Sequence, residues 1–409
     1  MSSNFPALND AGQVQFFSTL IGTSGGVIDD EGIFRGTGGP LVQIARGGQA
    51  APDGDGRFAA FRFHTLNNSG QAAFVGDLFA NSGGSSENSA IFRVDGGSLV
   101  QLAREGQAAP DANGNLRDFG PPSLNDAGQT SFRASLTATS GGASDNSGIF
   151  LGNGGPLNQI VRRGQVPPDG NGSFDTFNTT ELNDVGQVAF SASLSGTPTA
   201  VDDSGIFRGA GGPITQIARG GQVAPHGIGN LYQFSTRALN SAGMVAVHAS
   251  LIYSDGNRGI YRGDGGPLTQ IVHHLQTEPP DGNGTFFGFG APSLNDAGQV
   301  AFLATFSGTS GGSSDAVGIF LFDDSGGLMQ LARAGTPLLG STVTGLGFIG
   351  DNGQYFDDRR GFNELGQVVY RFELAMVAAV LQSHRYPPSR NRVPTCSPSS
   401  TKRPKSPGR

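Results

Sequence analysis

The stretch from Phe174 to Arg219 reads FDTFNTTELNDVGQVAFSASLSGTPTAVDDSGIFRGAGGPITQIAR. It contains four short runs in which apolar and polar residues alternate, the pattern of half-buried β-strands. The runs are residues 174–182, 187–194, 204–209 and 214–219. Turn-forming residues separate them, with Asn183 to Gly186 after the first run and Ala210 to Pro213 after the third. The stretch therefore predicts a four-stranded antiparallel meander.

Three phrases of this stretch recur along the chain at a nearly constant interval. An Asn-x-x-Gly phrase begins at Asn9, Asn67, Asn125, Asn183, Asn240, Asn295 and Asn363. A Gly-Ile-Phe phrase places an aromatic residue at Phe34, Phe92, Phe150, Phe207, Tyr261 and Phe320. A Gln-Ile-Ala-Arg phrase ends at Arg46, Arg104, Arg162, Arg219, His273 and Arg333. Successive Asn-x-x-Gly phrases are 58, 58, 58, 57, 55 and 68 residues apart, so the chain is a tandem repeat.

Four antiparallel strands per unit favour an all-β propeller, because one thin sheet cannot bury both of its faces and must stack against its neighbours. Residues 1–374 are predicted to form six full four-stranded blades plus a partial seventh, since the last two phrases have no seventh copy. A parallel β-helix and a pair of β-sandwiches are the rival architectures. Residues 375–409 are predicted to be a disordered tail rich in Pro, Ser, Lys and Arg, with a helical turn or two near residues 375–382.

Composition supports this assignment and excludes several classes of function. The chain has 67 glycines among 409 residues, which disfavours helices. The tail holds seven of the 26 Lys and Arg residues and no acidic residue, so residues 1–374 have 19 basic and 33 acidic residues, a net charge of −14. An acidic body repels nucleic acid, and the longest apolar run, Leu374 to Leu381, is too short to span a bilayer. Cys396 is the single cysteine, which excludes an intrachain disulfide. We expect a monomer.

The phrases LNDAGQVAF (residues 294–302), GIFRGxGGP and QIARxGQ resemble those of bacterial tandem-repeat proteins described by an Asn-x-x-Gly-x-x-x-Phe signature. The resemblance covers nearly all of residues 4–374. It implies a propeller-like fold and an extracellular or cell-surface location, with a varied C-terminal anchor and without established catalytic residues. The N-terminal sequence MSSNFPALND shows no signal peptide and the tail shows no recognisable anchor, which departs from that pattern.

Residues repeated in every unit are predicted to be structural, since a catalytic site has to break the symmetry of the ring. The Asn of each Asn-x-x-Gly phrase is expected to bond the backbone of its own turn, with sugar binding as the alternative. The Arg of each Gln-Ile-Ala-Arg phrase is expected to pair with nearby acids or carbonyls, with ligand binding as the alternative. A series of aromatic residues is expected to pack between blades, namely Phe16, Phe74, Phe132, Phe190 and Phe302.

Strand direction places two kinds of loop on one face of the ring, opposite the Asn-x-x-Gly turns. Both kinds are acidic and predict a ring of carboxylates, partly offset by the arginines at the strand ends. The loops between second and third strands contribute Asp29, Asp30, Asp145, Asp202, Asp203 and Asp315. The crossings between units contribute Asp53, Asp55, Asp111, Asp169 and Asp281.

The crossings also resemble pieces of calcium loops, because Asp and Asn oxygens at alternate positions suit a hard cation. The candidate calcium ligands are Asp53, Asp55, Asp169, Asn171, Asp281 and Asn283. An ordinary solvated Pro-Asp-Gly turn is the alternative interpretation. Calcium is the one cofactor that the sequence suggests.

Catalytic candidates are residues that break the repeat. Five histidines break the repeat, namely His64, His226, His248, His273 and His274. Sequence drift between the units, without a function, is the simpler interpretation of these residues. We therefore expect a non-enzymatic scaffold for extracellular or cell-surface binding, whose loop face engages a glycan, a cation or a protein. One alternative is a propeller-type polysaccharide hydrolase or lyase, for which Glu181, Asp175 and Asp118 are unpaired candidates. A purely structural envelope component is the other alternative.

Overall fold

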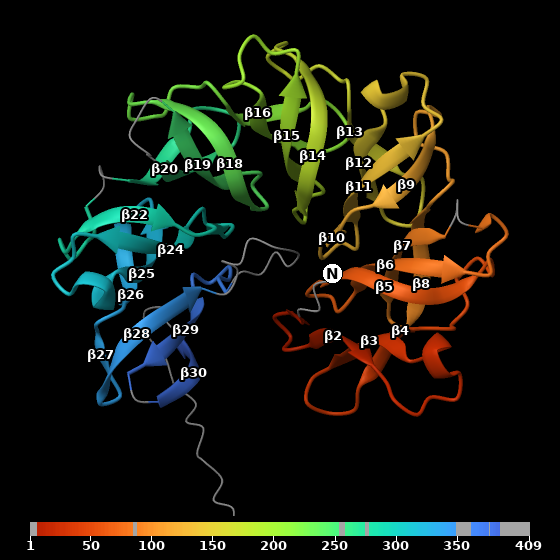
Figure 1. Cartoon of the computed structure of the whole chain (residues 1–409), viewed down its shortest axis with the longest axis horizontal. Coiled ribbons are helices and arrows are strands. Elements are labelled where there is room, and N and C mark those ends of the chain that lie inside the picture. The colour runs from red at the N-terminus through yellow and green to blue at the C-terminus, as the bar shows by residue number, and fades with distance from the viewer. Residues whose placement is uncertain are drawn as a thin grey trace, which may run out of the picture.

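The computed structural model describes residues 6–84, 88–252, 258–274, 278–348, 361–375 and 377–384. These residues form seven antiparallel β-sheets that follow one another along the chain. Figure 1 shows the sheets placed side by side around a ring, from the first sheet in red to the seventh in blue. The all-β, propeller-like fold that the repeat predicts is therefore confirmed.

The first, second and fourth sheets have four strands in sequential order, so that consecutive strands are neighbours, and the third sheet has five strands. The first consists of β1 (Ala7–Leu8), β2 (Val14–Thr19), β3 (Glu31–Gly36) and β4 (Val42–Arg46). The second consists of β5 (Arg57–Leu66), β6 (Ala72–Phe79), β7 (Ser89–Asp95) and β8 (Ser98–Arg104). The third consists of β9 (Asn115–Phe119), β10 (Ser123–Leu124), β11 (Thr130–Thr137), β12 (Ser147–Gly152) and β13 (Asn158–Arg162), with both β9 and β10 paired to β11. The fourth consists of β14 (Ser173–Leu182), β15 (Val188–Ser195), β16 (Ser204–Gly209) and β17 (Thr215–Arg219).

The remaining sheets follow the same plan. The fifth consists of β18 (Asn230–Leu239), β19 (Val245–Ile252), β20 (Arg258–Gly263) and β21 (Thr269–His273). The sixth consists of β22 (Thr285–Phe289), β23 (Ser293–Leu294), β24 (Val300–Ser307), β25 (Val317–Asp323) and β26 (Gly327–Arg333). The seventh consists of β27 (Pro337–Leu338), β28 (Ser341–Phe348), β29 (Val368–Leu374) and β30 (Val377–His384). Short 3-10 helices lie between second and third strands at η1 (Gly26–Ile28), η3 (Gly142–Ser144) and η4 (Gly312–Asp315).

The fourth sheet reproduces the four runs predicted from its sequence. Leu182 at the end of β14 pairs with Val188 at the start of β15, and the two strands stay paired as far as Ser173 and Ser195. The turn between them closes at Gly186, whose φ of +82° lies in the left-handed region that favours glycine. The Asn-x-x-Gly phrase is thus the hairpin turn between the first and second strands of a unit.

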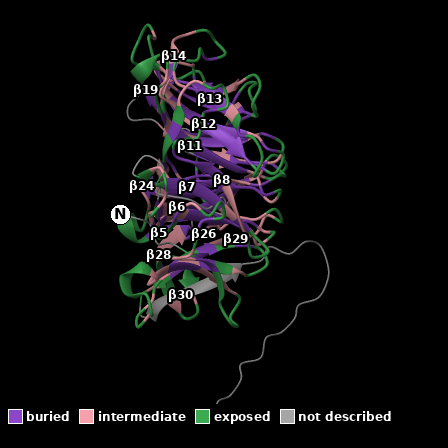
Figure 2. Cartoon of the chain, turned by 90° about the vertical axis from the view of Figure 1, so that its right-hand side faces the viewer, coloured by how far each residue is buried: buried purple, intermediate pink, exposed green. Residues whose placement is uncertain are grey.

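The cores lie between neighbouring sheets, each core joining one face of a sheet to the opposite face of the next. Val75 and Ile91 of the second sheet pack against Phe132 and Phe150 of the third. Four members of the predicted aromatic series are fully buried, namely Phe74, Phe132, Phe190 and Phe302. Phe16, in the first sheet, is only half-buried. Figure 2 shows the buried residues within the sheets and the exposed residues in the loops at the rims.

The seventh sheet is partial when it is aligned with the repeat. The turn at Asn363 precedes β29, so β28, β29 and β30 correspond to the first three strands of a unit. The short strand β27 corresponds to the bridges that mark earlier crossings, such as Ala50 with Arg57. Among the described residues, a fourth strand of the Gln-Ile-Ala-Arg type does not follow β30.

The beginning of the predicted disordered tail forms a strand, which corrects the sequence analysis. Residues 377–384 form β30 and pair with β29, so the helical turns expected over 375–382 are wrong. The free edge of β29 offers backbone donors and acceptors that outweigh the local helix propensity of the alanines. Residues 385–409, the rest of the predicted tail, lie outside the described residues. Of the helices described, none is long and apolar enough to cross a membrane.

Candidate functional site

The Asn-x-x-Gly turns link each sheet to the next. In the third unit, the Asn125 Oδ1 atom accepts a hydrogen bond from the Gln129 backbone N–H (2.8 Å). The Asn125 Nδ2 group donates to Gln129 Oε1 (2.8 Å) and to the backbone carbonyl of Asn183 in the fourth unit (2.9 Å). The prediction of a bond within the turn is confirmed, and the same side chain also bonds the neighbouring unit.

This contact between units is repeated around the ring. The Nδ2 group of each preceding Asn donates to the backbone carbonyl of Asn67 (3.0 Å), Asn125 (2.7 Å), Asn183 (2.9 Å), Asn240 (2.8 Å), Asn295 (3.0 Å) and Asn363 (3.5 Å). Because both polar atoms of these amides are engaged in such bonds, the repeated Asn residues act structurally.

The Arg that ends a Gln-Ile-Ala-Arg phrase joins its strand to two loops. Arg162 is buried, and its Nη1 group donates to both carboxylate oxygens of Asp111 in the preceding crossing (2.8 and 2.7 Å). Its Nε group donates to the backbone carbonyl of Asp145 (2.8 Å), and its Nη2 group donates to that of Asn113 (2.6 Å). Arg104, Arg219 and Arg333 repeat the ion pair, with Asp53, Asp169 and Asp281. The predicted pairing with acids and carbonyls is confirmed.

The candidate calcium ligands are distributed over three crossings, two to each. Asp53, Asp169 and Asp281 are paired with the arginines just described. Asp55 accepts hydrogen bonds from the backbone N–H (2.7 Å) and hydroxyl (2.9 Å) of Ser82. Asn171 and Asn283 donate to the carboxylates of Asp202 (2.7 Å) and Asp315 (2.8 Å). The described residues contain no group of three or more His, Cys, Asp or Glu arranged to hold a metal. Calcium binding stays a prediction.

These contacts also change the interpretation of the acidic loop face. The loops and the crossings lie on one face, as predicted, because Asn171 in a crossing bonds Asp202 in a loop. Many of their carboxylates accept hydrogen bonds from arginine, asparagine, serine or threonine and are not free for a cation. Hydrogen bonds from Asn171 and Thr199 outweigh the effect of burial on Asp202 and hold the pKa of its carboxyl below the ordinary value.

The crossing between the fourth and fifth units replaces the Asp–Arg pair by two histidines. His226 occupies the position of the crossing Asp and His273 the position of the strand-end Arg, and their ring centroids are 4.0 Å apart. The His226 Nδ1 atom accepts a hydrogen bond from the Ile228 backbone N–H (3.0 Å), as Asp169 does from Asn171 (3.0 Å). The two substitutions thus belong to one contact. Aligning the units would have revealed this relation, because both residues fall on positions of one repeated pair.

The other histidines are held in separate places. The His64 ring lies 3.1 Å (Nδ1) from the amide Nε2 atom of Gln15, between the first and second sheets. His248 Nδ1 lies 2.6 Å from the Ser235 hydroxyl, and the buried His274 contacts the ring of Phe287. His64 lies in the second sheet, whereas His248 and His274 belong to the fifth unit and contact different partners there.

The carboxylates considered for glycoside hydrolysis are also scattered. Asp175 lies on β14 and forms an ion pair with Arg163 (2.6 Å). Asp118 lies on β9 beside Arg117 (3.8 Å), and Glu181 lies on β14. Neither Asp is paired with another candidate carboxylate.

Three buried or half-buried histidines predict that acid weakens the fold. Burial lowers the pKa of His64, His248 and His273 to about 4. The charge of Arg258 lowers the pKa of His248 further, and the neighbouring His226 lowers that of His273. The ordinary value in the unfolded chain is about 6.5, so the unfolded state binds more protons between these values. Stability is therefore complete above about pH 6.5 and is lost as the pH falls toward 4, by about 1–3 kcal/mol per histidine.

Urea unfolding at pH 7.5 and pH 5 measures this loss. His64→Thr, which introduces the residue found at the equivalent Thr180, should reduce the difference between the two pH values by about 1–3 kcal/mol. A variant with the same pH dependence as the original chain would contradict the assignment.

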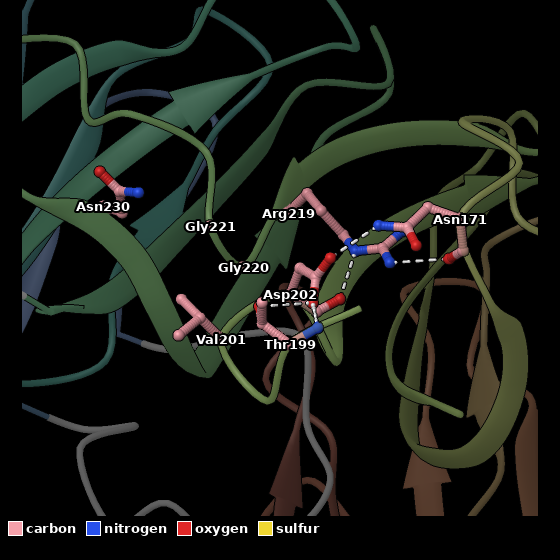
Figure 3. Close-up of a pocket in the computed structure, with 8 residues that line it drawn as sticks. All are labelled: Asn171, Thr199, Val201, Asp202, Arg219, Gly220, Gly221 and Asn230. Carbon is pink, nitrogen blue, oxygen red and sulfur yellow. Dashed lines mark hydrogen bonds between the residues drawn. The ribbon is translucent and has the colours of Figure 1, made fainter. Parts of the chain in front are cut away.

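A polar cavity of about 440 Å³ opens beside the fourth sheet on the loop face. Its lining includes Asn171, Thr199, Asp202, Arg219, Gly220 and Asn230. Figure 3 shows Arg219, Asp202, Thr199 and Asn171 joined by hydrogen bonds, with Asn230 apart from them beyond the two glycines. The sequence analysis named Asn171 and Asp202 in other roles and missed Thr199, Gly220 and Asn230.

The residue that follows the strand-end Arg or His varies in size between units, and it is a glycine in the first and fourth units, at Gly47 and Gly220. The residue that follows the strand-end Arg is Glu105 in the second unit, Arg163 in the third and His274 in the fifth. Arg163 extends across its loops to Asn146 (3.1 Å) and Asp175 (2.6 Å). A Cβ atom on Gly220 would meet the backbone carbonyl of Val201, so this close approach of two backbone segments requires a glycine.

The sequence matches a protein family described as "Family of unknown function (DUF7453)" over residues 1–151 and 137–375. No curated protein matches the chain. Among solved structures, the chain is similar to the β-propeller domain of the Trilobed protease from Pyrococcus furiosus, with a TM-score of 0.46, 11% identity and coverage of 92% of this chain and 93% of that one.

Two further solved structures are similar in the same way. Pyrococcus horikoshii acylaminoacyl peptidase matches with a TM-score of 0.42, 12% identity and 93% of this chain, which spans 50% of the peptidase chain. Penicillium chrysogenum α-L-arabinanase, solved with arabinobiose, matches with a TM-score of 0.35, 14% identity and coverage of 78% and 92%. At these identities, the likeness concerns the fold alone.

Proposed function

We propose that this chain, which belongs to the family of unknown function DUF7453, is a non-enzymatic binding scaffold that holds a glycan on its loop face. The observation that supports this function is the polar cavity of the fourth unit. The repeated Asn and Arg residues form contacts between units. These side chains therefore stabilise the fold and are not available to bind a ligand. A ligand site is then expected where one unit differs from the others.

The chemistry of the cavity favours a ligand rich in hydroxyl groups. The Asp202 carboxylate is ionised at neutral pH and offers an acceptor, because its pKa lies below the ordinary value. Thr199 and Asn230 add a hydroxyl and an amide, which both donate and accept hydrogen bonds. Cavities of 300–1,000 Å³ are typical of small-ligand sites. We further propose an exported or cell-surface location, which the similarity to repeat proteins with the Asn-x-x-Gly-x-x-x-Phe signature supports.

Filling the cavity is expected to abolish glycan binding without harm to the fold. Asn230 begins β18, and the equivalent residue of the second unit is Arg57, so a long basic side chain is compatible with this position. Asn230→Arg should weaken binding of a glycan selected on a polysaccharide array by at least about tenfold, measured by calorimetry.

Asn115→Arg is the matched control, because Asn115 begins the equivalent strand β9 of the third unit. The control should bind as the original chain does. Equal binding by both variants would place the ligand elsewhere, and cleavage of any glycan on the array, detected by mass, would contradict a non-enzymatic role.

A further inference from the structure

The fourth unit lacks one hydrogen bond that three other units form on the loop face. In the third unit, the Asn113 Oδ1 atom of the crossing accepts a hydrogen bond from the backbone N–H of Ser140, in the loop between the second and third strands (2.7 Å). The equivalent pairs are Asp55 with Ser82 in the second unit (2.7 Å) and Asn283 with Ser310 in the sixth (2.8 Å). In each pair the donor follows the acceptor by 27 residues, so the bond is a repeated link between a crossing and a loop.

Proline takes the place of the donor in the fourth unit. Asn171 is the equivalent crossing residue, and the residue 27 positions later is Pro198, which has no backbone N–H. The next residue, Thr199, donates its backbone N–H to Asp202 (3.1 Å), as the residue after Ser140 does to the equivalent aspartate of the third unit (3.2 Å). The two loops are therefore equivalent at this point, and proline removes the donor.

The Asn171 side chain keeps one of the two contacts that its counterparts make. Its Nδ2 group donates to the Asp202 carboxylate (2.7 Å), as those of Asn113 and Asn283 do in their own units. Among the described residues, none donates a hydrogen bond to the Asn171 Oδ1 atom. Figure 3 shows the bond from the amide nitrogen to Asp202 and no bond from the residues drawn to the amide oxygen. Because Asn171 lines the polar cavity, this oxygen is an acceptor for a bound molecule.

The charges at the cavity disfavour an acidic ligand. Arg219, the basic residue of the lining, forms an ion pair with Asp169 (2.7 Å) and donates to the backbone carbonyls of Asp202 and Asn171. The Asp202 carboxylate adds a second negative charge, so the site has two carboxylates for one guanidinium. This excess of negative charge repels the carboxylate or sulfate groups of an acidic glycan. A sugar hydroxyl donates a hydrogen bond without carrying a negative charge, and it therefore suits the Asn171 acceptor.

We infer that Asn171 Oδ1 receives a hydroxyl group of a neutral glycan in the place of the missing backbone N–H. Asn171 is then the residue that selects a donor group, and Pro198 is the residue that keeps this acceptor available. The inference rests on the proposed function of the loop face, and it adds the class of glycan and the atom that binds it.

Pro198→Ala restores a backbone N–H and tests the inference. The new N–H should bond to Asn171 Oδ1, as that of Ser140 does to Asn113, and so compete with the glycan. Binding of a neutral glycan selected on a polysaccharide array should weaken by at least about tenfold, measured by calorimetry in the presence of EGTA. Pro213→Ala is the matched control, because Pro213 is an exposed proline of the same unit that lies before β17 and outside the cavity lining. The control should bind as the original chain does.

Hydrogen exchange gives a readout that does not require the glycan. In Pro198→Ala, the restored N–H should exchange with solvent at least about tenfold more slowly than the N–H of Ala200, an exposed residue of the same loop, measured by nuclear magnetic resonance. A general loosening of the loop by the loss of proline would not protect this N–H. Fast exchange of the restored N–H, or unchanged glycan binding by the variant, would overturn the inference.

The outcomes separate this inference from the proposed function. If the original chain binds no glycan, the proposed function itself is contradicted. If Asn230→Arg weakens glycan binding and Pro198→Ala does not, the inference alone is overturned. Binding of acidic glycans only would overturn it as well. Binding that EGTA abolishes would also overturn it, because a cation would then occupy Asn171 Oδ1.

Discussion

Arg162→Leu is expected to lower the free energy of unfolding by about 2–4 kcal/mol, measured by urea denaturation at pH 7.5. Arg162 is 5% exposed, and its guanidinium donates to the Asp111 carboxylate and to the backbone carbonyls of Asp145 and Asn113. Leucine retains apolar volume but leaves these acceptors without their donor. Asp111 is exposed, but hydrogen bonds that a buried guanidinium donates are charge-assisted and contribute about 1.5–3 kcal/mol each.

Arg46→Leu is the matched control for this prediction. Arg46 ends the equivalent strand of the first unit, and its side chain is 30% exposed. Among the described residues, its guanidinium contacts Asp29, at 2.8 Å to the carbonyl and 3.5 Å to the carboxylate. The control should cost less than about 1 kcal/mol, as exposed ion pairs do. Equal losses for the two variants would show that the link to the preceding crossing does not stabilise the ring.

Asn125→Asp is expected to destabilise the chain by about 3–5 kcal/mol at pH 7.5. The Asn125 Nδ2 group faces two acceptors, Gln129 Oε1 and the Asn183 carbonyl, and the substitution replaces this donor by a carboxylate oxygen in a buried position. Burial and the facing acceptors should raise the pKa of the new carboxyl in the folded state. A raised pKa makes the folded state relatively more stable below the unfolded value, so the loss should shrink as the pH falls to about 4.

The pH dependence separates this effect from simple loss of packing. Asn153→Asp, an exposed residue whose Oδ1 atom accepts a hydrogen bond from the Gly155 N–H, should be nearly neutral at every pH. A loss at Asn125→Asp that stays constant between pH 4 and pH 7.5 would contradict the hydrogen-bond assignment.

The strands of a unit can be predicted from the sequence because the residue pattern that defines each strand lies within the strand and its turns. Alternation of apolar residues and the glycine at position 186 define β14, β15 and the turn between them. The bond from Asn125 to Asn183 could not be predicted in the same way, because its partners are 58 residues apart and meet only when the sheets pack. Repetition indicated a structural role for the Asn but not its link to the next unit.

The crossing residues show a second limit. Asp169 followed by Gly and Asn has the spacing of a calcium-loop fragment, and the same spacing is required for a turn whose carboxylate pairs with Arg219. The choice between these roles depends on a residue 50 positions away. The strand β30 could not be predicted from its local sequence either. Its composition favours a helix, but pairing with the edge of β29 outweighs this preference.

The central claim is that the sheets surround a common axis, so that the first and seventh lie nearer each other than the first and fourth, as Figure 1 shows. Electron paramagnetic resonance can measure this with spin labels on exposed turns, at Thr37 in the first unit, Ala210 in the fourth and Leu365 in the seventh, after Cys396→Ser. The ring predicts a shorter mean distance for the pair at 37 and 365 than for the pair at 37 and 210. A longer distance for the first pair would show sheets stacked in a line and would contradict the propeller.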